Sequence, residues 1–401
     1  MDLASGLITH PATSGTGRET AEGIASTLSP RLYSLDVMRG GTMALMLMVD
    51  VCGDTVPFFS HAEWSGLHLA DFVMPSFIII VGASLAHSLP KALTRRERGE
   101  VFVSACIRSC KLFAVGLLMQ GPWIPAIDGS KDMLGFDLEK VRIMGILQRI
   151  SICYISTAAL VLYVTSETAR NGIVFSLVIL QQAILGIVSV PGCPVHGDKY
   201  SRECNSEAYI DRIVLGASHL YRPELGYDPE GLVSTLGCVL TCFAGYLVVQ
   251  PRWRNYKARI GISGVISLMG LLAWSVGDIP FNKALWTVSF NLTSIGVCVT
   301  FLTCIDCLNI RNIDSNPLAH LGMNAIFFFI CSDSCGLFNV LIQSFWLTRD
   351  GAKVTLTSWF IEDILSVPTH PDYIVIYALV QLIFYLGVTR FFFQRRIFFK
   401  L

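Results

Sequence analysis

The sequence predicts an all-α, polytopic integral membrane protein with about ten transmembrane helices and both termini in the cytosol. Hydrophobic residues make up 53% of the 401 residues and charged residues only 15%, whereas soluble domains carry about 25% charged residues. The apolar residues also form long uninterrupted runs, and a bilayer core about 30 Å thick needs roughly 20 such residues per helix. Strands of a membrane barrel would alternate polar and apolar residues, so the runs favour helices.

The apolar runs place the expected spans in order along the chain. They cover residues 35–53, 68–90, 101–121, 143–164, 173–191, 230–250, 259–276, 284–308, 317–337 and 372–394. Residues 1–30 are rich in Ser, Thr, Gly and Ala and are expected to form a disordered cytosolic tail. Residues 31–401 are expected to form one transmembrane domain. The net charge is zero, so no basic surface for nucleic acid is predicted.

Lysine and arginine distinguish the two sides of the membrane. They are dense in short connections such as 91–98, 252–259 and 390–400, and short positive connections face the cytosol. The longer connections near 54–67, 121–142, 192–229 and 338–371 are therefore expected on the lumenal side. A site for a polar lumenal molecule would be built from these loops.

The thirteen cysteines do not form a metal-binding pattern. Most lie inside apolar runs, where cysteine is a small hydrophobic residue. Cys193 and Cys204 lie in a polar loop instead. They can form a disulfide if that loop faces an oxidising lumen, and otherwise they remain free thiols.

Several charged or amide residues lie inside the expected spans, where such groups are costly and usually face the protein interior. They are Asp36, Arg39, Arg108, Lys111, Gln148, Arg149, Asn291 and Asn324. Each has a structural alternative. Asp36 and Arg39 can pair at i, i+3 on one helix, the two cations of the third span can extend toward the headgroups, and the asparagines can join helices.

His61 is the strongest candidate for chemistry. It lies in the short connection between the first two spans, and Asp71 follows ten residues later, where the next helix begins. Imidazole titrates near neutral pH and acts as a base or nucleophile, and a carboxylate can fix its tautomer. The spacing permits this contact if the loop folds back. The alternative is an ordinary polar loop residue.

Short motifs in a fixed order resemble the heparan-α-glucosaminide N-acetyltransferase family, in particular its plant and microbial members. They lie at residues 31–40 (RLYSLDVMRG), 61–75 (HAEWSGLHLADFVMP), 141–149 (VRIMGILQR), 209–212, 219–221, 227–231, 279–287 and 321–325. The resemblance implies a membrane-embedded enzyme that takes acetyl from cytosolic acetyl-CoA and delivers it to a sugar amine across the membrane. It places the active histidine of the family on His61 and an acidic position on Asp71.

Such a reaction needs basic groups for the coenzyme phosphates and polar groups for a cationic sugar. The candidates for acetyl-CoA are Asp36, Arg39, Arg108, Lys111, Gln148 and Arg149, and those for the acceptor are Trp64, Asp228, Glu230, Asn282 and Asn324. Arg142 lies on the predicted lumenal side, so it serves the acetyl end of the site or the structure. Acetyl-CoA is expected as a co-substrate, with no metal.

Two other functions stay open. One is O-acetylation of a different glycan, and the other is a transporter without chemistry, in which the charges inside the spans line a path. In animal members of the family the acceptor is the terminal glucosamine of heparan sulfate in the lysosome. For this chain, a lysosomal or vacuolar membrane, another endomembrane and the plasma membrane all remain open, as does a homodimer.

Overall fold

The computed structural model describes ten stretches of the chain. They are residues 30–89, 94–120, 141–193, 199–221, 226–253, 255–308, 315–332, 346–349, 352–355 and 372–399. The expected tail, apart from residue 30, the connection at 121–140 and most of the one at 338–371 lie outside the described residues. The predictions made for them therefore stay predictions.

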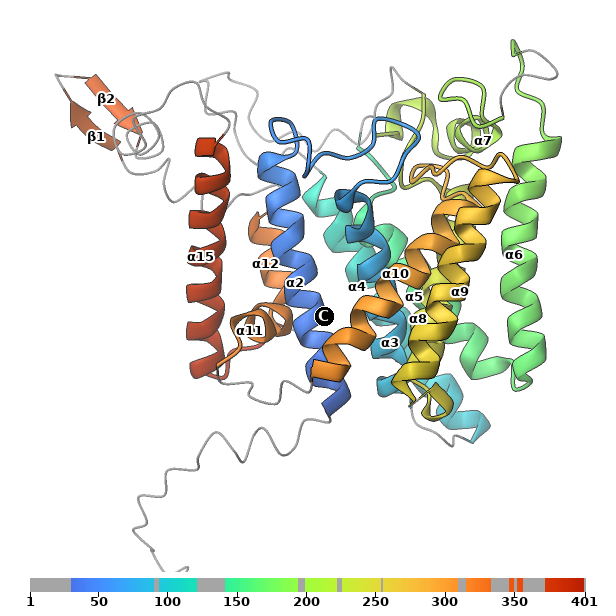
Figure 1. Ribbon diagram of the computed structural model, residues 1–401, viewed down its shortest axis with the longest axis horizontal. Coiled ribbons are helices and arrows are strands. Elements are labelled where there is room, and N and C mark those ends of the chain that lie inside the picture. The colour runs from blue at the N-terminus through green and yellow to red at the C-terminus, as the bar shows by residue number, and fades with distance from the viewer. Residues whose placement is uncertain are drawn as a thin grey trace, which may run out of the picture.

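Helices make up nearly all of the described chain (Figure 1). The long helices are α2 (Pro30–Cys52), α3 (Val73–Ser88), α4 (Arg95–Met119), α5 (Ile146–Tyr163), α6 (Glu167–Ile187), α8 (Leu232–Val248), α9 (Tyr256–Ser275), α10 (Val288–Leu308) and α15 (Asp372–Gln394). The shorter ones are α7 (Ser206–Leu215), α11 (Pro317–Met323), α12 (Ala325–Ser332) and the 3-10 turns η1 (Leu69–Phe72), η2 (Ala217–His219) and η3 (Pro251–Trp253).

A small hairpin departs from the all-α expectation. Strands β1 (Trp346–Arg349) and β2 (Ala352–Thr355) pair antiparallel, with Trp346 opposite Thr355 and Arg349 opposite Ala352. Both strands fall within the expected connection 338–371, outside the apolar runs, so the hairpin leaves the helical membrane-spanning part unchanged.

Seven helices of the described chain have the length and hydropathy to cross a membrane. They are Leu69–Ser88, Arg96–Met119, Ile146–Tyr163, Glu167–Ile187, Tyr256–Ser275, Val288–Leu308 and Ile374–Gln394. These helices support the class of polytopic helical membrane proteins. The other three expected spans correspond to α2, which carries four charged residues, to the shorter α8 and to the pair α11–α12, which is interrupted at Asn324. The count of ten therefore stays a prediction.

The helices form an inner and an outer tier. In the apolar stretches of α3 and α10, 67% of the residues are buried, against 17% in those of α4, α6 and α9. The outer helices expose large apolar side chains such as Val103, Ile179 and Leu268. A soluble surface does not carry so much exposed apolar area, so this outer tier fits contact with lipid.

Glycines let two pairs of inner helices approach closely. A Cβ on Gly82 of α3 would lie 1.8 Å from a carbonyl oxygen of α8, and one on Gly245 of α8 would lie 2.2 Å from a carbonyl oxygen of α3. Gly40 of α2 and Gly322 of α11 make the same kind of contact, because a Cβ on either would lie 1.9 Å from a carbonyl oxygen of the partner helix. Small residues are the usual means by which membrane helices pack backbone to backbone.

The connections gather at two ends of the bundle (Figure 1). We call the upper end the one that holds residues 53–68, 188–193, 199–221, 226–231 and 276–287, including α7. The lower end holds the start of α2 and residues 89, 94, 164–166, 249–253 and 255. The expected lumenal loop 54–67 and the described parts of the loop 192–229 both lie at the upper end.

The close contact of α2 and α11 predicts that a larger side chain at Gly322 destabilises the protein. Gly322→Ala should lower the thermal stability of the purified protein by several degrees, since overpacking costs about 1–3 kcal/mol and the clash is with backbone. Gly264→Ala in α9 is the control, because a Cβ there meets nothing within 4 Å. Thermal unfolding in detergent measures both. Equal stability of the two variants would contradict the close approach of α2 and α11.

Candidate active site

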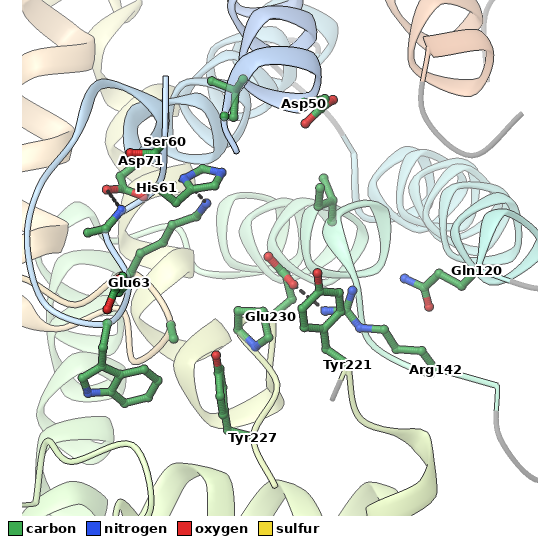
Figure 2. A pocket seen from close by; sticks show the side chains of 18 of the residues that line it. Asp50, Ser60, His61, Glu63, Asp71, Gln120, Arg142, Tyr221, Tyr227 and Glu230 are labelled. Atoms are coloured by element: carbon green, nitrogen blue, oxygen red, sulfur yellow. Dashed lines mark hydrogen bonds and ion pairs between the residues drawn. The ribbon is translucent and has the colours of Figure 1, made fainter. Parts of the chain in front are cut away.

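A cavity of about 810 Å³ opens at the upper end of the bundle (Figure 2). Its wall comes from the last turn of α2, the loop after it, the first turn of α5, the segment before α8 and the loop between α9 and α10. Charged and titratable side chains line the cavity: Asp50, Asp54, His61, Glu63, Asp71, Arg142, Arg202, Glu230 and Lys283. A concave site with convergent ionisable groups is the usual place to look for chemistry.

His61 and Asp71 meet in this cavity. His61 Nδ1 lies 2.8 Å from Asp71 Oδ1, and Asp71 Oδ2 accepts from the backbone N–H groups of His68 at 3.0 Å and Ala62 at 3.4 Å. The Asp71 side chain is 1% exposed, whereas that of His61 is 45% exposed. The buried carboxylate therefore fixes both the imidazole and the backbone on either side of the loop.

The pair defines what the imidazole can do. In a neutral ring, donation from Nδ1–H to Asp71 leaves the lone pair on Nε2. The carboxylate also stabilises the positive ring that forms when Nε2 takes up a proton or an acyl group. The loop conformation that the sequence permitted is the one that the structure adopts.

Lys283 approaches the same imidazole from the opposite wall. Its Nζ lies 3.4 Å from His61 Nδ1, and it faces the carboxylates of Asp71, Glu230 and Asp50. Burial lowers the pKa of Lys283, although Asp71 and Glu230 act in the opposite sense. The ammonium therefore adds a positive charge beside the His61–Asp71 pair at an energetic cost.

The loop that carries Lys283 is held in an unusual conformation. Asp278 has φ 51° and Trp286 has φ 47°, and positive φ is rare for a bulky residue. Asn282 organises the turn: its Oδ1 accepts from Leu285 N at 2.9 Å, and its backbone N–H donates to Thr287 Oγ1 at 3.1 Å. Such strain persists only where the surroundings over-determine it, and it is common at functional sites.

The side chain of Arg149 packs against Trp286, at the end of the loop that carries Lys283. Its side chain is fully buried, donates to Ser234 Oγ in α8 and lies with Cζ 5.2 Å from the ring of Trp286. Trp286 Nε1 in turn donates to Thr241 Oγ1 at 3.3 Å. These contacts join α5, α8 and the loop before α10.

The side chain of Arg142 lines the cavity and is bound by two carboxylates. Its guanidinium donates to both carboxylate oxygens of Asp228, at 3.0 and 2.6 Å, and to Glu230. The ring of Tyr221 covers it, with the centroid 4.5 Å from Cζ. The two carboxylates raise the pKa of Arg142 despite its burial, so it stays charged. Paired burial of this kind fixes the backbone before α8.

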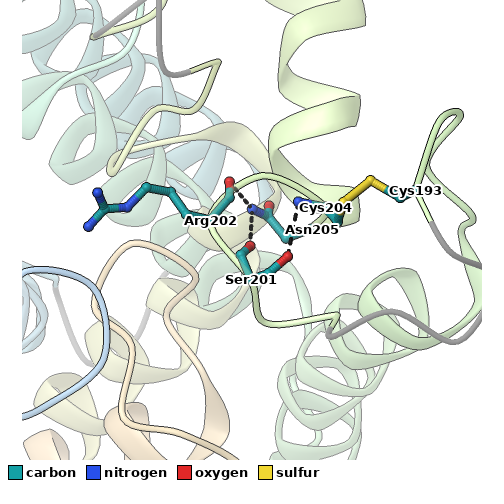
Figure 3. The surroundings of a disulfide bond; sticks show 5 residues. All are labelled: Cys193, Ser201, Arg202, Cys204 and Asn205. Carbon is teal, nitrogen blue, oxygen red and sulfur yellow. Dashed lines mark hydrogen bonds between the residues drawn. A yellow bond between two sulfur atoms is a disulfide. The ribbon is translucent and has the colours of Figure 1, made fainter.

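A disulfide holds the segment that closes one side of the cavity (Figure 3). Cys193 and Cys204 are bonded, so the structure contains the disulfide that the sequence left open. The Ser201 hydroxyl accepts from Cys204 N at 3.0 Å, and Asn205 Nδ2 donates to the Ser201 carbonyl oxygen at 2.9 Å. Asn205 then caps α7 through Ala208 N. Residues 199–204, which we call the disulfide segment, therefore lead directly into α7, whose first turn is capped by Asn205.

The disulfide segment is hydrogen-bonded to the loop that carries His61. Trp64 Nε1 donates to the Tyr200 carbonyl oxygen at 2.7 Å, and Arg202 donates to the Glu63 carbonyl oxygen at 2.7 Å. The guanidinium of Arg202 also lies 5.4 Å from the Trp64 ring, which meets Tyr227 edge to face. The residues immediately after His61 are thus fixed by a segment more than one hundred residues away in sequence.

The part of the chain that carries His61 and Asp71 is similar to known proteins. Residues 31–190 match the family model described as "Heparan-alpha-glucosaminide N-acetyltransferase, catalytic". The human protein named heparan-α-glucosaminide N-acetyltransferase is 28% identical over 76% of this chain and 53% of its own length, and the mouse protein is 28% identical over 75% and 53%. Over these residues the chain is similar to the heparan-α-glucosaminide N-acetyltransferase family. It spans about half the length of these relatives.

Five of the expected site residues line the cavity: His61, Trp64, Asp71, Gln148 and Glu230. The other expected residues lie outside its lining: Asp36, Arg39, Arg108, Lys111, Arg149, Asp228, Asn282 and Asn324. The cavity thus unites the histidine, its carboxylate and part of the expected acceptor site, but not the expected cationic site for the coenzyme.

Asp36 and Arg39 pair on α2, as the sequence allowed. Arg39 Nη1 lies 2.6 Å from Asp36 Oδ1 and 3.1 Å from the Gly322 carbonyl oxygen, and Nη2 donates to Ser84 Oγ at 3.1 Å. Arg39 therefore joins α2, α3 and α11. It lies about 16 Å below Asp50 along the helix axis, at 1.5 Å per residue.

Two predicted coenzyme ligands lie on the outer tier. Arg108 and Lys111 are exposed on α4, and the guanidinium of Arg108 lies 5.2 Å from the ring of Tyr154. Arg149 lies elsewhere, buried near the upper end of α5. The sequence could not show this because position along a span does not reveal which face of a helix meets its neighbours. The structure does not bring these three cations together.

Three predicted acceptor ligands have structural partners instead. Asp228 is bound by Arg142, and Asn282 Oδ1 organises its own turn. Asn324 lies at the break between α11 and α12, where its Oδ1 accepts from Phe399 N at 3.1 Å. None of these side chains lines the cavity, so their role in sugar binding stays a prediction.

The prediction omitted Lys283, Arg202 and Gln120, all of which line the cavity. Lys283 lies within one of the family motifs, so its motif was the available signal. Arg202 follows Cys193 by nine residues, and only the disulfide and the contact with Trp64 direct it to the site. Nothing in the sequence around Gln120 identified it.

Helix α7 places two buried carboxylates beside the start of α8. Asp211 Oδ1 accepts from Leu232 N at 3.1 Å and Val233 N at 3.4 Å, which caps α8. Glu207 accepts from Gln181 Nε2 at 2.9 Å. Burial raises the pKa of Asp211 to about 7, with a further contribution from Asp228. Burial likewise raises the pKa of Glu207.

Asp211 predicts stability that increases as the pH falls. An unfolded aspartate titrates near 3.9, so between about pH 4 and 7 the folded protein holds an extra proton at Asp211. The free energy of unfolding should therefore decrease as the pH rises from about 4 to 7 and level off above 7, with a change of up to about 4 kcal/mol from this group. Asp211→Asn should flatten the dependence, whereas Asp278→Asn, at an exposed position, should retain it. Thermal unfolding from pH 5 to 8 tests this; an unchanged profile in Asp211→Asn would contradict the assignment.

Proposed function

We propose that this chain is a transmembrane acetyltransferase that moves acetyl from cytosolic acetyl-CoA to the amine of a sugar on the other side of the membrane. The observation that carries the proposal is the buried Asp71 carboxylate holding an accessible His61 at the wall of a polar cavity. The match to the family model and the names of the human and mouse relatives support the reaction class and the terminal glucosamine of a heparan-like glycan as acceptor.

The orientation of the bundle supports transfer across the membrane. The Cys193–Cys204 disulfide lies at the upper end with His61, and disulfides persist in oxidising compartments rather than the cytosol. Short connections rich in lysine and arginine lie at the lower end, which fits the cytosolic side. The acceptor therefore reaches His61 from the lumenal or extracellular side. A lysosomal or vacuolar membrane and a homodimer remain part of the prediction.

His61 Nε2 performs the central step by one of two routes. In the covalent route, Nε2 attacks the thioester carbonyl, the C–S bond breaks and coenzyme A leaves as thiolate; the sugar amine then attacks the acetyl-imidazole and regenerates His61. In the direct route, Nε2 removes a proton from the amine as it attacks the thioester, and the proton passes to the leaving thiolate. Asp71 stabilises the positive imidazole in both.

The charge of the cavity suits a cationic acceptor. Carboxylates of Asp50, Asp54, Glu63 and Glu230 line it, and an amino sugar brings a protonated amine. Arg142 neutralises part of this charge at Glu230, and Lys283 lies beside His61. The approach of the ammonium of Lys283 favours loss of a proton from a neighbouring cation, which is the form of the amine that the reaction needs.

The donor enters from the lower end. Arg39 is the candidate for contact with the coenzyme, because it lies about 16 Å below Asp50 and its side chain remains partly exposed despite its contacts with Asp36, Gly322 and Ser84. Arg108 and Lys111 can add attraction at the outer face of α4. Arg149 is left out of the donor site, since it is buried.

Substitution of His61 gives the direct test. Proteoliposomes with glucosamine sealed inside and labelled acetyl-CoA outside should accumulate N-acetylglucosamine inside. His61→Ala should lower the rate by about 10²–10⁴-fold, as expected for loss of an acid–base group, and Asp71→Asn by at least about tenfold. Ser65→Ala is the control, because this exposed side chain lies outside the cavity lining.

The same vesicles separate the alternatives. Full activity in His61→Ala would remove His61 from the mechanism, and uptake of intact acetyl-CoA or sugar without acetylation would indicate a transporter. Acetylation of N-acetylglucosamine, whose amine is blocked, would indicate O-acetylation. Acid-quenched protein that retains labelled acetyl in the absence of acceptor, but not after His61→Ala, would select the covalent route.

A further inference from the structure

One lobe of the cavity holds two amide side chains that the reaction at His61 does not use. Gln148, in the first turn of α5, is 0% exposed and lines the cavity. Within the described part of the chain, neither its Oε1 nor its Nε2 has a hydrogen-bond partner. Gln120, at the end of α4, donates to the Met144 carbonyl oxygen at 3.2 Å, and its buried Oε1 has no partner there either.

The backbone around the two amides leaves space for them. A Cβ on Gly116 would lie 2.4 Å from Gln148 Oε1, and a Cβ on Gly145 would lie 1.8 Å from Gln120 Nε2. Any larger residue at either position would displace an amide. The glycines of α4 and of the segment before α5 thus accommodate a pair of side chains that bond to almost nothing within the described chain.

The lobe is polar but neutral. Met119, Ile146 and Leu147 line it beside the two glutamines. The nearest cation of the lining on this part of the chain is Arg142, and Asp228 and Glu230 already neutralise it. Unpaired buried amides are unfavourable, so such a lobe fits a ligand that supplies both donors and acceptors without charge. Hydroxyl groups have this property, and so do amides.

We propose that Gln148 and Gln120 form a subsite for the hydroxyl groups of the acceptor sugar, remote from its reacting amine. The inference rests on the proposed function and deepens it. Figure 2 places Gln120 across Arg142 and Tyr221 from His61, at the far side of the cavity. With the amine at His61, the remainder of a glucosamine-terminated glycan extends toward this lobe.

The donor has amides of its own, in its pantetheine arm, and these are the competing ligand. The end of α4 and the first turn of α5 lie at the upper end of the bundle, on the level of the His61 loop. A thioester that arrives from the side of Arg39 brings its arm behind it, toward the lower end. The position of the glutamines therefore favours the acceptor.

Kinetics in both substrates test the subsite. Gln148→Met should raise the KM for a glucosamine-terminated disaccharide about three- to tenfold, the range for one or two neutral hydrogen bonds, while kcat changes less than twofold and the KM for acetyl-CoA stays the same. Gln120→Met should act in the same direction and less strongly. Gln182→Met in α6 is the matched control, because its Nε2 is also buried without a partner in the described chain but lies outside the cavity lining.

Deoxy analogues of the disaccharide complete the test. At least one analogue should lose affinity for the wild-type protein and lose nothing further for Gln148→Met, because the same bond is then removed from both sides. The disaccharide should raise the melting temperature of the detergent-solubilised protein less in Gln148→Met than in the wild type. The melting temperature without ligand shows whether the variant is folded.

The outcomes distinguish failure of the glutamine subsite from failure of the proposed acetyltransferase function. A raised KM for acetyl-CoA with an unchanged acceptor KM would overturn the subsite and assign the amides to the donor arm, and unchanged constants for both substrates would overturn it as well. Failure of the wild-type protein to acetylate any amino sugar would count against the proposed function instead.

Discussion

The arrangement at the upper end depends on one buried carboxylate. Asp71 accepts from the His61 imidazole with one oxygen and from the backbone of Ala62 and His68 with the other. A carboxylate in such surroundings is tolerable only with its bonds made. The same bonds therefore close the loop, orient the imidazole and define which ring nitrogen faces the cavity.

The opposite walls are held by equally specific contacts from distant segments. The turn organised by Asn282 brings Lys283 to the imidazole, and the disulfide segment fixes the residues after His61 through Trp64. Arg142 ties the segment before α8 to the lining of the cavity. Beneath them, glycine contacts between α3 and α8 and between α2 and α11 allow a tightly packed inner tier. Rigid support of this kind keeps a reacting group in position.

The helical membrane class, most of the helix positions and the His61–Asp71 pair could be predicted because each depends on local pattern. Runs of apolar residues identify spans, and ten residues suffice for a short loop to return to the next helix. The expected ligands were less predictable. Arg39 and Asn324 were identified as polar residues within spans, yet their partners are a carbonyl of α11 and the backbone of Phe399. Helix polarity alone does not identify such partners.

The sequence by itself determined that the chain is a helical membrane protein, which end of the bundle carries the long polar loops, and which histidine and carboxylate belong together. The motifs also indicated the family. Only the tertiary structure decided that Arg149 faces Trp286, that Asp228 neutralises Arg142, and that Lys283, Arg202 and two unpaired glutamines complete the cavity. The physical reason is that hydropathy depends on residues adjacent in the chain, whereas side-chain pairing depends on the rotation and contact of helices far apart in it.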